Sequence, residues 1–317
     1  MLTGLSADSA EKYTERILNM EKVFFVPIVD VSWKTLGPLN PRKNYSCPPP
    51  PLELCAEEAD GIVTLYKKLL DGKLNFTVYT GTYCRDSFTE EPFNSIWRRC
   101  IDNGGEILVH THEEIARVGT RNNEEPHMRK VITRQFQRMK AAGITPAGFR
   151  GGLYGYANFL TPLMEGLGMD TDLTAAPGIN KPDRAAEWEG VPYTAWRLCR
   201  NDKCHVGCDC ANPSKVVEIP LGADGLGTEN ENYLYVDYDL SSLENAKRIW
   251  DCVLARYEKT GKPQMIHTLF HTFSMSDPNM VERYSRFSDY MLATGGVPVN
   301  ATEAHRIFEE KLEPLGI

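Results

Sequence analysis

The chain has 317 residues, of which 42% are hydrophobic and 25% are charged, as expected for a globular protein with a substantial core. Its formal net charge of −8 argues against a general nucleic-acid-binding protein, because such proteins need a basic surface to neutralise phosphates. The polar N-terminus lacks the apolar core of a signal peptide, and no apolar stretch is long enough to span a bilayer. We therefore expect a cytoplasmic protein without a membrane span.

Short apolar runs alternate with amphipathic stretches along most of the chain. The apolar runs predict strands at Val23–Asp30, Asn75–Thr80, Glu106–His110, Ala147–Arg150, Val216–Pro220, Tyr233–Tyr238 and Met265–Phe270. The amphipathic stretches predict helices at Ala59–Leu70, Glu91–Asp102, Met128–Ala142, Asn158–Gly168, Leu243–Lys259 and Met280–Thr294. Several of these helices end near glycine, the usual C-terminal signal. This alternation indicates an α/β protein whose parallel strands are covered by helices, as a barrel or as an open sheet.

Two segments interrupt the alternation. The prolines of CPPPPLEL, at Cys47–Leu54, predict a stiff polyproline loop. The stretch from Ala175 to Ser214 is irregular and rich in Gly, Pro, Asp and Cys. Neither segment has the composition shift of a domain boundary, so we interpret residues 1–317 as one domain with a long insertion, at about 175–214, on its functional face.

Reactive side chains gather where predicted strands end, which is where parallel barrels carry their catalytic residues. Asp30 ends the first strand, Arg150 ends the fourth, and histidines end the third and the last. The four candidates after the third strand are His110, His112, Glu113 and Glu114, and those of the last strand are His267 and His271. A single histidine is more often a core residue, but four at two strand ends favour a metal or acid–base site. His110 and Glu114 would share one face of a helical turn and could reach one cation.

The order of these segments resembles the polysaccharide deacetylase family of the NodB-homology type, with divergent motifs. The resemblance is carried by FTVYTGTYCRD, NGGEILVHTHEE, the stretch from GITPAGFRGGLYGY to MDTDL, VVEIPLG and GGVPVNATEAHRI. It implies a distorted (β/α) barrel of about seven parallel strands that hydrolyses N-acetyl or N-formyl groups on sugars. Three positions depart from the family pattern. Asp30 stands alone where two aspartates are usual, Glu114 replaces a histidine unless His112 substitutes for it, and Gly151 replaces a proline.

The resemblance also implies roles for the candidate residues. A divalent cation, with Zn²⁺ as the expected ion, would be held by Asp30, His110 and Glu114, with His112 as an alternative ligand. Asp30 is either a ligand or the base, and Glu113 is another candidate base. Arg150 would orient a carboxylate.

The acid would be His271 or His267, with a slight preference for His271 because a polar loop follows it. A backbone N–H just after Arg150 would help to hold the oxyanion. The implied substrate is a small or carrier-linked amino sugar, and an oligomer is compatible with the sequence. The alternative is a catalytically degenerate barrel that binds a sugar or a nucleotide-sugar.

The segment CRNDKCHVGCDC concentrates four of the nine cysteines, namely Cys199, Cys204, Cys208 and Cys210. Thiolates this dense could form a second, structural zinc site, although their spacing is not that of a zinc ribbon. The other interpretation is a loop of free or disulfide-prone thiols.

Overall fold

The computed structural model describes residues 22–31, 52–79, 86–115, 119–204, 210–225, 235–237 and 241–316. Its main sheet has the strand order β10-β11-β7-β6-β3-β2-β1-β12, and β13 also pairs with β1. The strands are β1 (Val23–Asp30), β2 (Asn75–Tyr79), β3 (Glu106–Thr111), β6 (Phe149–Gly151), β7 (Thr171–Asp172), β10 (Trp196–Cys199), β11 (Pro213–Glu218), β12 (Gln264–His271) and β13 (Gly296–Pro298). The run β11, β7, β6, β3, β2, β1 and β12 is parallel throughout, and β10 is antiparallel to β11.

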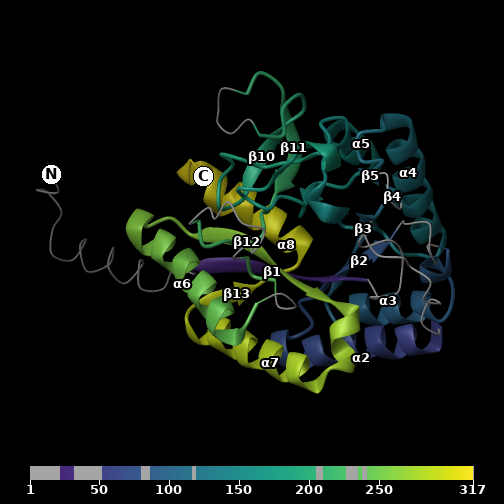
Figure 1. Cartoon of the computed structure of the whole chain (residues 1–317), viewed down its shortest axis with the longest axis horizontal. Coiled ribbons are helices and arrows are strands. Elements are labelled where there is room, and N and C mark those ends of the chain that lie inside the picture. Colours follow the sequence, from purple (N-terminus) through teal and green to yellow (C-terminus); the bar gives the residue numbers. More distant parts are fainter. Residues whose placement is uncertain are drawn as a thin grey trace, which may run out of the picture.

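The two ends of this parallel run approach each other beyond β11. Leu221 forms a parallel bridge with His267 of β12. The N–H of His267 donates to the carbonyl of Pro220 at 2.8 Å, and the N–H of Gly222 donates to the carbonyl of His267 at 3.0 Å. The sheet therefore curls into a distorted barrel, with β1 and β12 running through the middle of the molecule (Figure 1). The prediction of about seven parallel strands in a distorted barrel is confirmed.

Helices cover the outside of the sheet, as the alternation predicts. They are α2 (Leu52–Leu70), α3 (Phe93–Asp102), α4 (Glu125–Ala141), α5 (Leu160–Leu167), α6 (Leu243–Thr260), α7 (Pro278–Ala293) and α8 (Ala301–Ile307). Helix α2 packs against α3 and α7, α6 packs against α7, and α4 packs against α5. All eight residues of β1 are buried, which is typical of a parallel strand covered on both faces and explains its almost unbroken apolar run. None of the helices in the described ranges is long and apolar enough to cross a membrane.

The sequence predicts most element positions to within a few residues, and the differences have local causes. Helix α2 begins at Leu52, so the predicted loop is wrong for Leu52–Leu54, while residues 47–51 lie outside the described residues. Half of the predicted strand Tyr233–Tyr238 also lies outside them, although Tyr235 and Asp237 form isolated bridges. Helix α8 was not predicted; its start is fixed by a capping box between Asn300 and Glu303.

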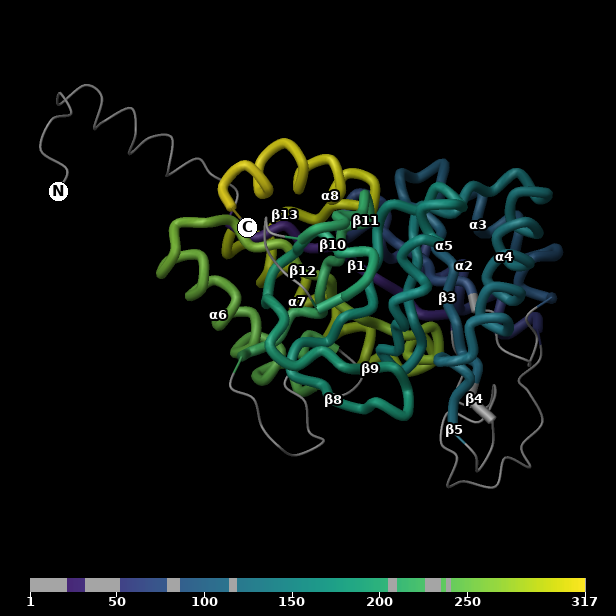
Figure 2. The backbone as a smooth tube through the Cα atoms, turned by 90° about the horizontal axis from the view of Figure 1, so that it is seen from above, coloured from purple at the N-terminus to yellow at the C-terminus, as the bar shows by residue number. Residues whose placement is uncertain are grey.

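The predicted insertion contains short secondary structure at the edge where the parallel strands end. The hairpin of β8 (Asn180–Lys181) and β9 (Ala186–Glu187) lies at the same side of the molecule as the hairpin of β4 (Glu114–Ile115) and β5 (Gly119–Thr120) (Figure 2). The two regions touch directly, since Asn122 Nδ2 donates to the carbonyl of Arg184 at 2.9 Å. The β4–β5 hairpin follows β3, whose end carries His110, and the β8–β9 hairpin follows β7.

Candidate functional site

A buried ion pair between Asp30 and Arg150 lies at the centre of the candidate site. Arg150 Nε donates to Asp30 Oδ1 at 2.9 Å and to Oδ2 at 3.1 Å. Thr77 Oγ1 donates to Asp30 Oδ1 at 2.6 Å. Burial alone would raise the pKa of Asp30, but the charges of Arg150 and two neighbouring histidines outweigh it, so this pKa lies well below its usual range. Asp30 is therefore an ionised carboxylate, and the prediction that Arg150 pairs with a carboxylate is confirmed.

His110, on β3, faces this carboxylate with its Nε2 atom. Its Nδ1 lies 3.0 Å from the carbonyl oxygen of Arg150, and because a carbonyl can only accept, Nδ1 carries the proton. Its Nε2 lies 3.6 Å from Asp30 Oδ2. Burial lowers the pKa of His110 to about 3, so the ring is neutral near pH 7. The ring of His112 contacts it edge-on, with 4.6 Å between the centroids.

The two histidines of β12 occupy different environments. His267 is fully buried, and its Nδ1 donates to the carbonyl of Ile219 at 2.7 Å. Its Nε2 lies 3.1 Å from Arg150 Nη1, and since a guanidinium can only donate, this Nε2 is an acceptor. Burial, followed by the charge of Arg150, lowers the pKa of His267 well below its usual range. His267 is therefore held as a neutral ring with both nitrogens occupied.

His271 is the more accessible of the two. It is in register with Asp30 on the neighbouring strand, and its Nε2 lies 3.8 Å from Asp30 Oδ2. Its side chain keeps 21% of its surface exposed, and its ring stacks on Phe273 with 5.1 Å between the centroids. The carboxylate of Asp30 is thus bordered by one guanidinium and two imidazole Nε2 atoms.

Solved structures with the same architecture place this geometry in a known fold. A protein described as a polysaccharide deacetylase from Mycobacterium smegmatis matches with a TM-score of 0.58 and 16% identity over 93% of each chain. A protein described as a polysaccharide deacetylase from Pseudomonas aeruginosa PAO1 matches with a TM-score of 0.57 and 12% identity over 92% of each chain. This chain has the polysaccharide deacetylase fold.

The sequence comparisons add no family assignment, because no protein-family model and no curated protein matches the chain. The fold is also shared by a protein described as Puue allantoinase, with a TM-score of 0.57 and 13% identity over 93% of each chain. The polysaccharide deacetylase fold therefore does not by itself select one substrate.

The predicted cation site is only partly represented in the described part of this fold. Of the expected ligands, His110 Nε2 and Asp30 Oδ2 face each other, and the Nδ1 of His110 is hydrogen-bonded to a carbonyl, as is usual for metal-binding histidines. The predicted helical turn that would place His110 and Glu114 on one face is wrong, because Glu114 begins strand β4. The side chain of Glu114 lies outside the described residues. Within those residues, no group of three or more His, Cys, Asp or Glu side chains is arranged to hold a metal ion. Arg150 already neutralises Asp30, so a cation here would gain less from Asp30 than from an unpaired carboxylate.

Glu113, the other candidate base, is engaged by a residue that the sequence did not suggest. Its Oε2 lies 2.6 Å from His127 Nε2 on helix α4. Glu113 is buried, and the His127 side chain keeps 17% of its surface exposed. No sequence spacing indicates this pair, because the contact depends on how α4 packs beside the loop after β3.

The backbone after Arg150 is tightly packed and strained. A Cβ atom on Gly151 would lie 1.9 Å from the carbonyl oxygen of Gly155, which explains why glycine occupies this position. Leu153 and Tyr154 both have positive φ, of 53° and 62°, an uncommon conformation that tends to occur at functional sites. The N–H of Gly151 donates to Thr174 Oγ1 at 2.7 Å, so it does not serve as the predicted oxyanion donor in this arrangement.

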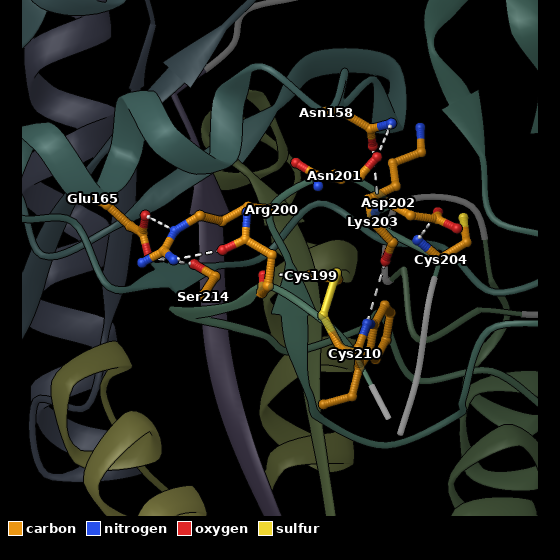
Figure 3. The surroundings of a disulfide bond; sticks show 12 residues. Asn158, Glu165, Cys199, Arg200, Asn201, Asp202, Lys203, Cys204, Cys210 and Ser214 are labelled. Atoms are coloured by element: carbon orange, nitrogen blue, oxygen red, sulfur yellow. Dashed lines mark hydrogen bonds and ion pairs between the residues drawn. A yellow bond between two sulfur atoms is a disulfide. The ribbon is translucent and has the colours of Figure 1, made fainter. Parts of the chain in front are cut away.

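The cysteine segment contains a disulfide, which confirms the interpretation of a disulfide-prone loop, and the alternative four-cysteine zinc site is wrong for two of its members. Cys199 and Cys210 are joined to each other (Figure 3), and disulfide sulfurs are not the thiolates that zinc requires. Cys204 Sγ lies 3.1 Å from the carbonyl of Glu187, and Cys208 lies outside the described residues. Lys203, in the same segment, reaches inward to donate to the carbonyls of Tyr156 at 2.5 Å and Ala185 at 2.6 Å. The segment therefore closes over the residues that follow the Arg150 loop.

Proposed function

We propose that this chain is a hydrolase that removes an acetyl or formyl group from the nitrogen of an amino sugar. The observation that carries the proposal is the ionised carboxylate of Asp30, fixed by Arg150 and bordered by the Nε2 atoms of His110 and His271. Amide hydrolysis needs a group that takes a proton from water and one that protonates the departing amine. A cluster of a carboxylate, imidazole groups and an orienting guanidinium at the strand ends of a barrel can supply these functions.

His271 is the residue that we assign to proton transfer. Histidine is the side chain whose ordinary pKa lies near neutrality, and the Nε2 of His271 lies 3.8 Å from Asp30 Oδ2 at the accessible side of the cluster. His267 is unsuited to this step, because both of its nitrogens are hydrogen-bonded and its pKa is lowered by burial. Asp30 itself is a weak base at its lowered pKa, so its proposed role is to orient and charge-stabilise His271. Glu113, which contacts His127, is the alternative acceptor of the water proton.

We further propose that the site takes a divalent cation, with Zn²⁺ as the expected ion. His110 and Asp30 would be ligands through Nε2 and Oδ2, and Glu114, or His112 in its place, would complete the set. When bound, such an ion would polarise the amide carbonyl and lower the pKa of a coordinated water. Arg150 would keep its role of holding Asp30 in place.

The proposed substrate is a small or carrier-linked amino sugar. Two aromatic rings lie beside the charged cluster: Tyr154, 5.7 Å from the guanidinium carbon of Arg150, and Tyr235, 6.4 Å from the Tyr154 ring. Aromatic faces of this kind suit the apolar face of a sugar ring. The fold neighbours described as polysaccharide deacetylases support the same substrate class.

The test is release of acetate or formate from N-acylated amino sugars. Candidates are free N-acetylglucosamine, its oligomers and its nucleotide-linked form, each measured against an Asp30→Asn variant. Release by the wild type and its loss in the variant would support the proposal. Because one fold neighbour is described as an allantoinase, allantoin belongs in the same panel, and turnover of allantoin alone would contradict the sugar assignment.

A second function has one observation in its favour. Val31, directly after Asp30, is fully buried and apolar, in a place where the family pattern expects a second aspartate. A barrel without that group could bind a sugar or nucleotide-sugar and leave it intact. Calorimetric binding of such a ligand, with no acyl release over a long incubation, would favour this alternative.

A further inference from the structure

Two buried acidic side chains, which take no part in the chemistry proposed above, lie directly behind Arg150. Asp172 ends β7 and Glu218 ends β11, and the two residues are partners in the parallel register of these strands. Both side chains are fully buried, and each carboxyl group lies close enough to the other to influence its pKa. Two negative charges in contact in the interior would be strongly destabilising, so the pair needs a specific explanation.

The hydrogen bonds around the pair show where a proton must lie. Asp172 Oδ1 accepts from the N–H of Leu173 at 2.9 Å and from Thr174 Oγ1 at 2.6 Å. Glu218 Oε1 accepts from the N–H groups of Thr174 at 3.1 Å and Ala175 at 2.8 Å. The other two oxygens, Asp172 Oδ2 and Glu218 Oε2, are buried and receive no N–H or O–H donor within the described residues. Two carboxyl oxygens attract each other only through a proton.

The electrostatic surroundings are consistent with a proton retained on the pair. Burial raises the pKa of Asp172 to about 6, and burial together with the charge of Asp172 raises the pKa of Glu218 well above its usual range. Other ionisable groups near the pair are the guanidinium of Arg150 on β6, the neutral phenol of Tyr156 and the ammonium of Lys203. Because Arg150 is already neutralised by Asp30, it does not replace the shared proton.

The segment that the pair holds is the one that holds the catalytic cluster. The carbonyl of Leu173 accepts from Arg150 Nη1 at 2.6 Å, and Thr174 Oγ1 accepts from the N–H of Gly151 at 2.7 Å. Next to Glu218, the N–H of Ile219 donates to the carbonyl of Asp172 at 2.9 Å. The carbonyl of Ile219 then accepts from His267 Nδ1. The Asp172–Glu218 pair therefore holds the backbone on both sides: the Leu173 carbonyl, which orients Arg150, and the Ile219 carbonyl, which orients His267.

We propose that Asp172 and Glu218 share a single proton and act together as positioning residues, fixing the Leu173 and Ile219 carbonyls that orient Arg150 and His267. The inference rests on the proposed function only for its catalytic consequence, since the shared proton and the backbone contacts exist whatever the substrate is. Loss of the proton would place two carboxylates in contact and loosen residues 173–175, so Arg150 would lose its fixed position beside Asp30.

Carboxyl-to-amide substitutions test this arrangement because an amide carries a permanent donor. In Glu218→Gln or Asp172→Asn, the amide N–H replaces the shared proton while its carbonyl keeps the backbone hydrogen bonds. In the double variant two NH₂ groups face each other, so no arrangement of the two amides satisfies all of their hydrogen bonds.

We expect each single variant to fold, and its stability to be less sensitive than that of the wild type to rising pH. We expect the double variant to be destabilised by far more than the sum of the single effects, as in a strongly coupled pair. Asp170→Asn, two residues before Asp172, is the matched control and should behave as the wild type.

Two measurements separate this proposal from the proposed function. The first is the melting temperature of all four variants between pH 4 and pH 8. The wild type binds more protons folded than unfolded in this range, so it should lose stability relative to Glu218→Gln as the pH rises. The second is the NMR signal of the Arg150 Nε–H, which is identified by its absence in Arg150→Lys. This signal should stay protected from solvent exchange in the single variants and be lost in the double variant.

Parallel pH curves of melting temperature for wild type and Glu218→Gln, or additive single effects on stability, would overturn the shared proton. A protected Arg150 signal in the double variant would overturn the positioning role. Neither result depends on turnover, so a chain that hydrolyses no amino sugar could still confirm the pair.

Discussion

Arg150 donates a hydrogen bond to His267, with 3.1 Å between Arg150 Nη1 and His267 Nε2. This contact, together with the bond from His267 Nδ1 to Ile219, makes His267 part of the scaffold that holds the guanidinium. The same guanidinium binds Asp30 through Nε. A histidine in the middle of β12 thus supports the charged cluster from one side, while His271 at the end of the strand faces it from the other.

The different positions of these histidines lead to a first prediction. His271→Ala should lower turnover by about 10²- to 10⁴-fold, the usual effect of losing a general acid–base group, and should leave the unfolding midpoint in urea nearly unchanged. His267→Ala should reduce stability as well, because it removes the buried donor to the Ile219 carbonyl and one of the two acceptors of Arg150 Nη1. Steady-state kinetics and urea titrations on both variants check this. Equal loss of stability in both variants, or full turnover in His271→Ala, would contradict the assignment.

A second prediction concerns acid sensitivity. The pKa of His267 in the folded protein is lowered well below its usual value, so below about pH 6.5 the unfolded chain binds more protons than the folded one. The free energy of unfolding should therefore decrease as the pH falls, by at most about 1.4 kcal/mol per pH unit for one such group. His267→Gln should remove part of this slope, and urea unfolding at pH 7, 6 and 5 would measure it. His305→Gln on α8 is the control. An identical slope in wild type and His267→Gln would show that His267 is not held neutral.

The buried ion pair gives a third prediction. Arg150→Met leaves Asp30 as a buried carboxylate without its cation, and breaking such a pair costs about 3–5 kcal/mol of unfolding free energy. Arg129→Met is the matched control, because Arg129 pairs with Glu125 at the surface of α4, where ion pairs contribute about 0–1 kcal/mol. Chemical denaturation of the two variants should show this difference. A loss below about 1 kcal/mol for Arg150→Met would mean that Asp30 finds another partner or takes up a proton.

The sequence predicted the parts of this molecule that depend on local pattern. Apolar runs gave the strands, and because parallel strands end at one edge, Asp30, His110, Arg150 and His271 could be expected to meet. The sequence could not show what lies between these residues. The carbonyls of Leu173 and Ile219 orient the cluster through the backbone, and every residue type has such a carbonyl. The contact between Glu113 and His127, and the choice of Cys210 as the partner of Cys199, depend on packing between segments that no spacing rule relates.

The last prediction concerns the cation. If Zn²⁺ binds at the strand ends, His110 is expected to contribute Nε2, because its Nδ1 proton points at the Arg150 carbonyl and fixes the tautomer that ligation needs. Purified wild-type protein should then contain about one equivalent of zinc by mass spectrometry, in line with a single site of this kind. His110→Ala should lose both the metal and the turnover. His305→Ala, on α8, should keep both. Chelation should remove activity in the wild type, and addition of Zn²⁺ should restore it.

Full turnover by protein shown to be free of metal would refute the proposed role of the cation and leave hydrolysis to Asp30, Arg150 and His271. Full metal occupancy in His110→Ala would instead place the ion on other residues, with Asp30 kept for Arg150.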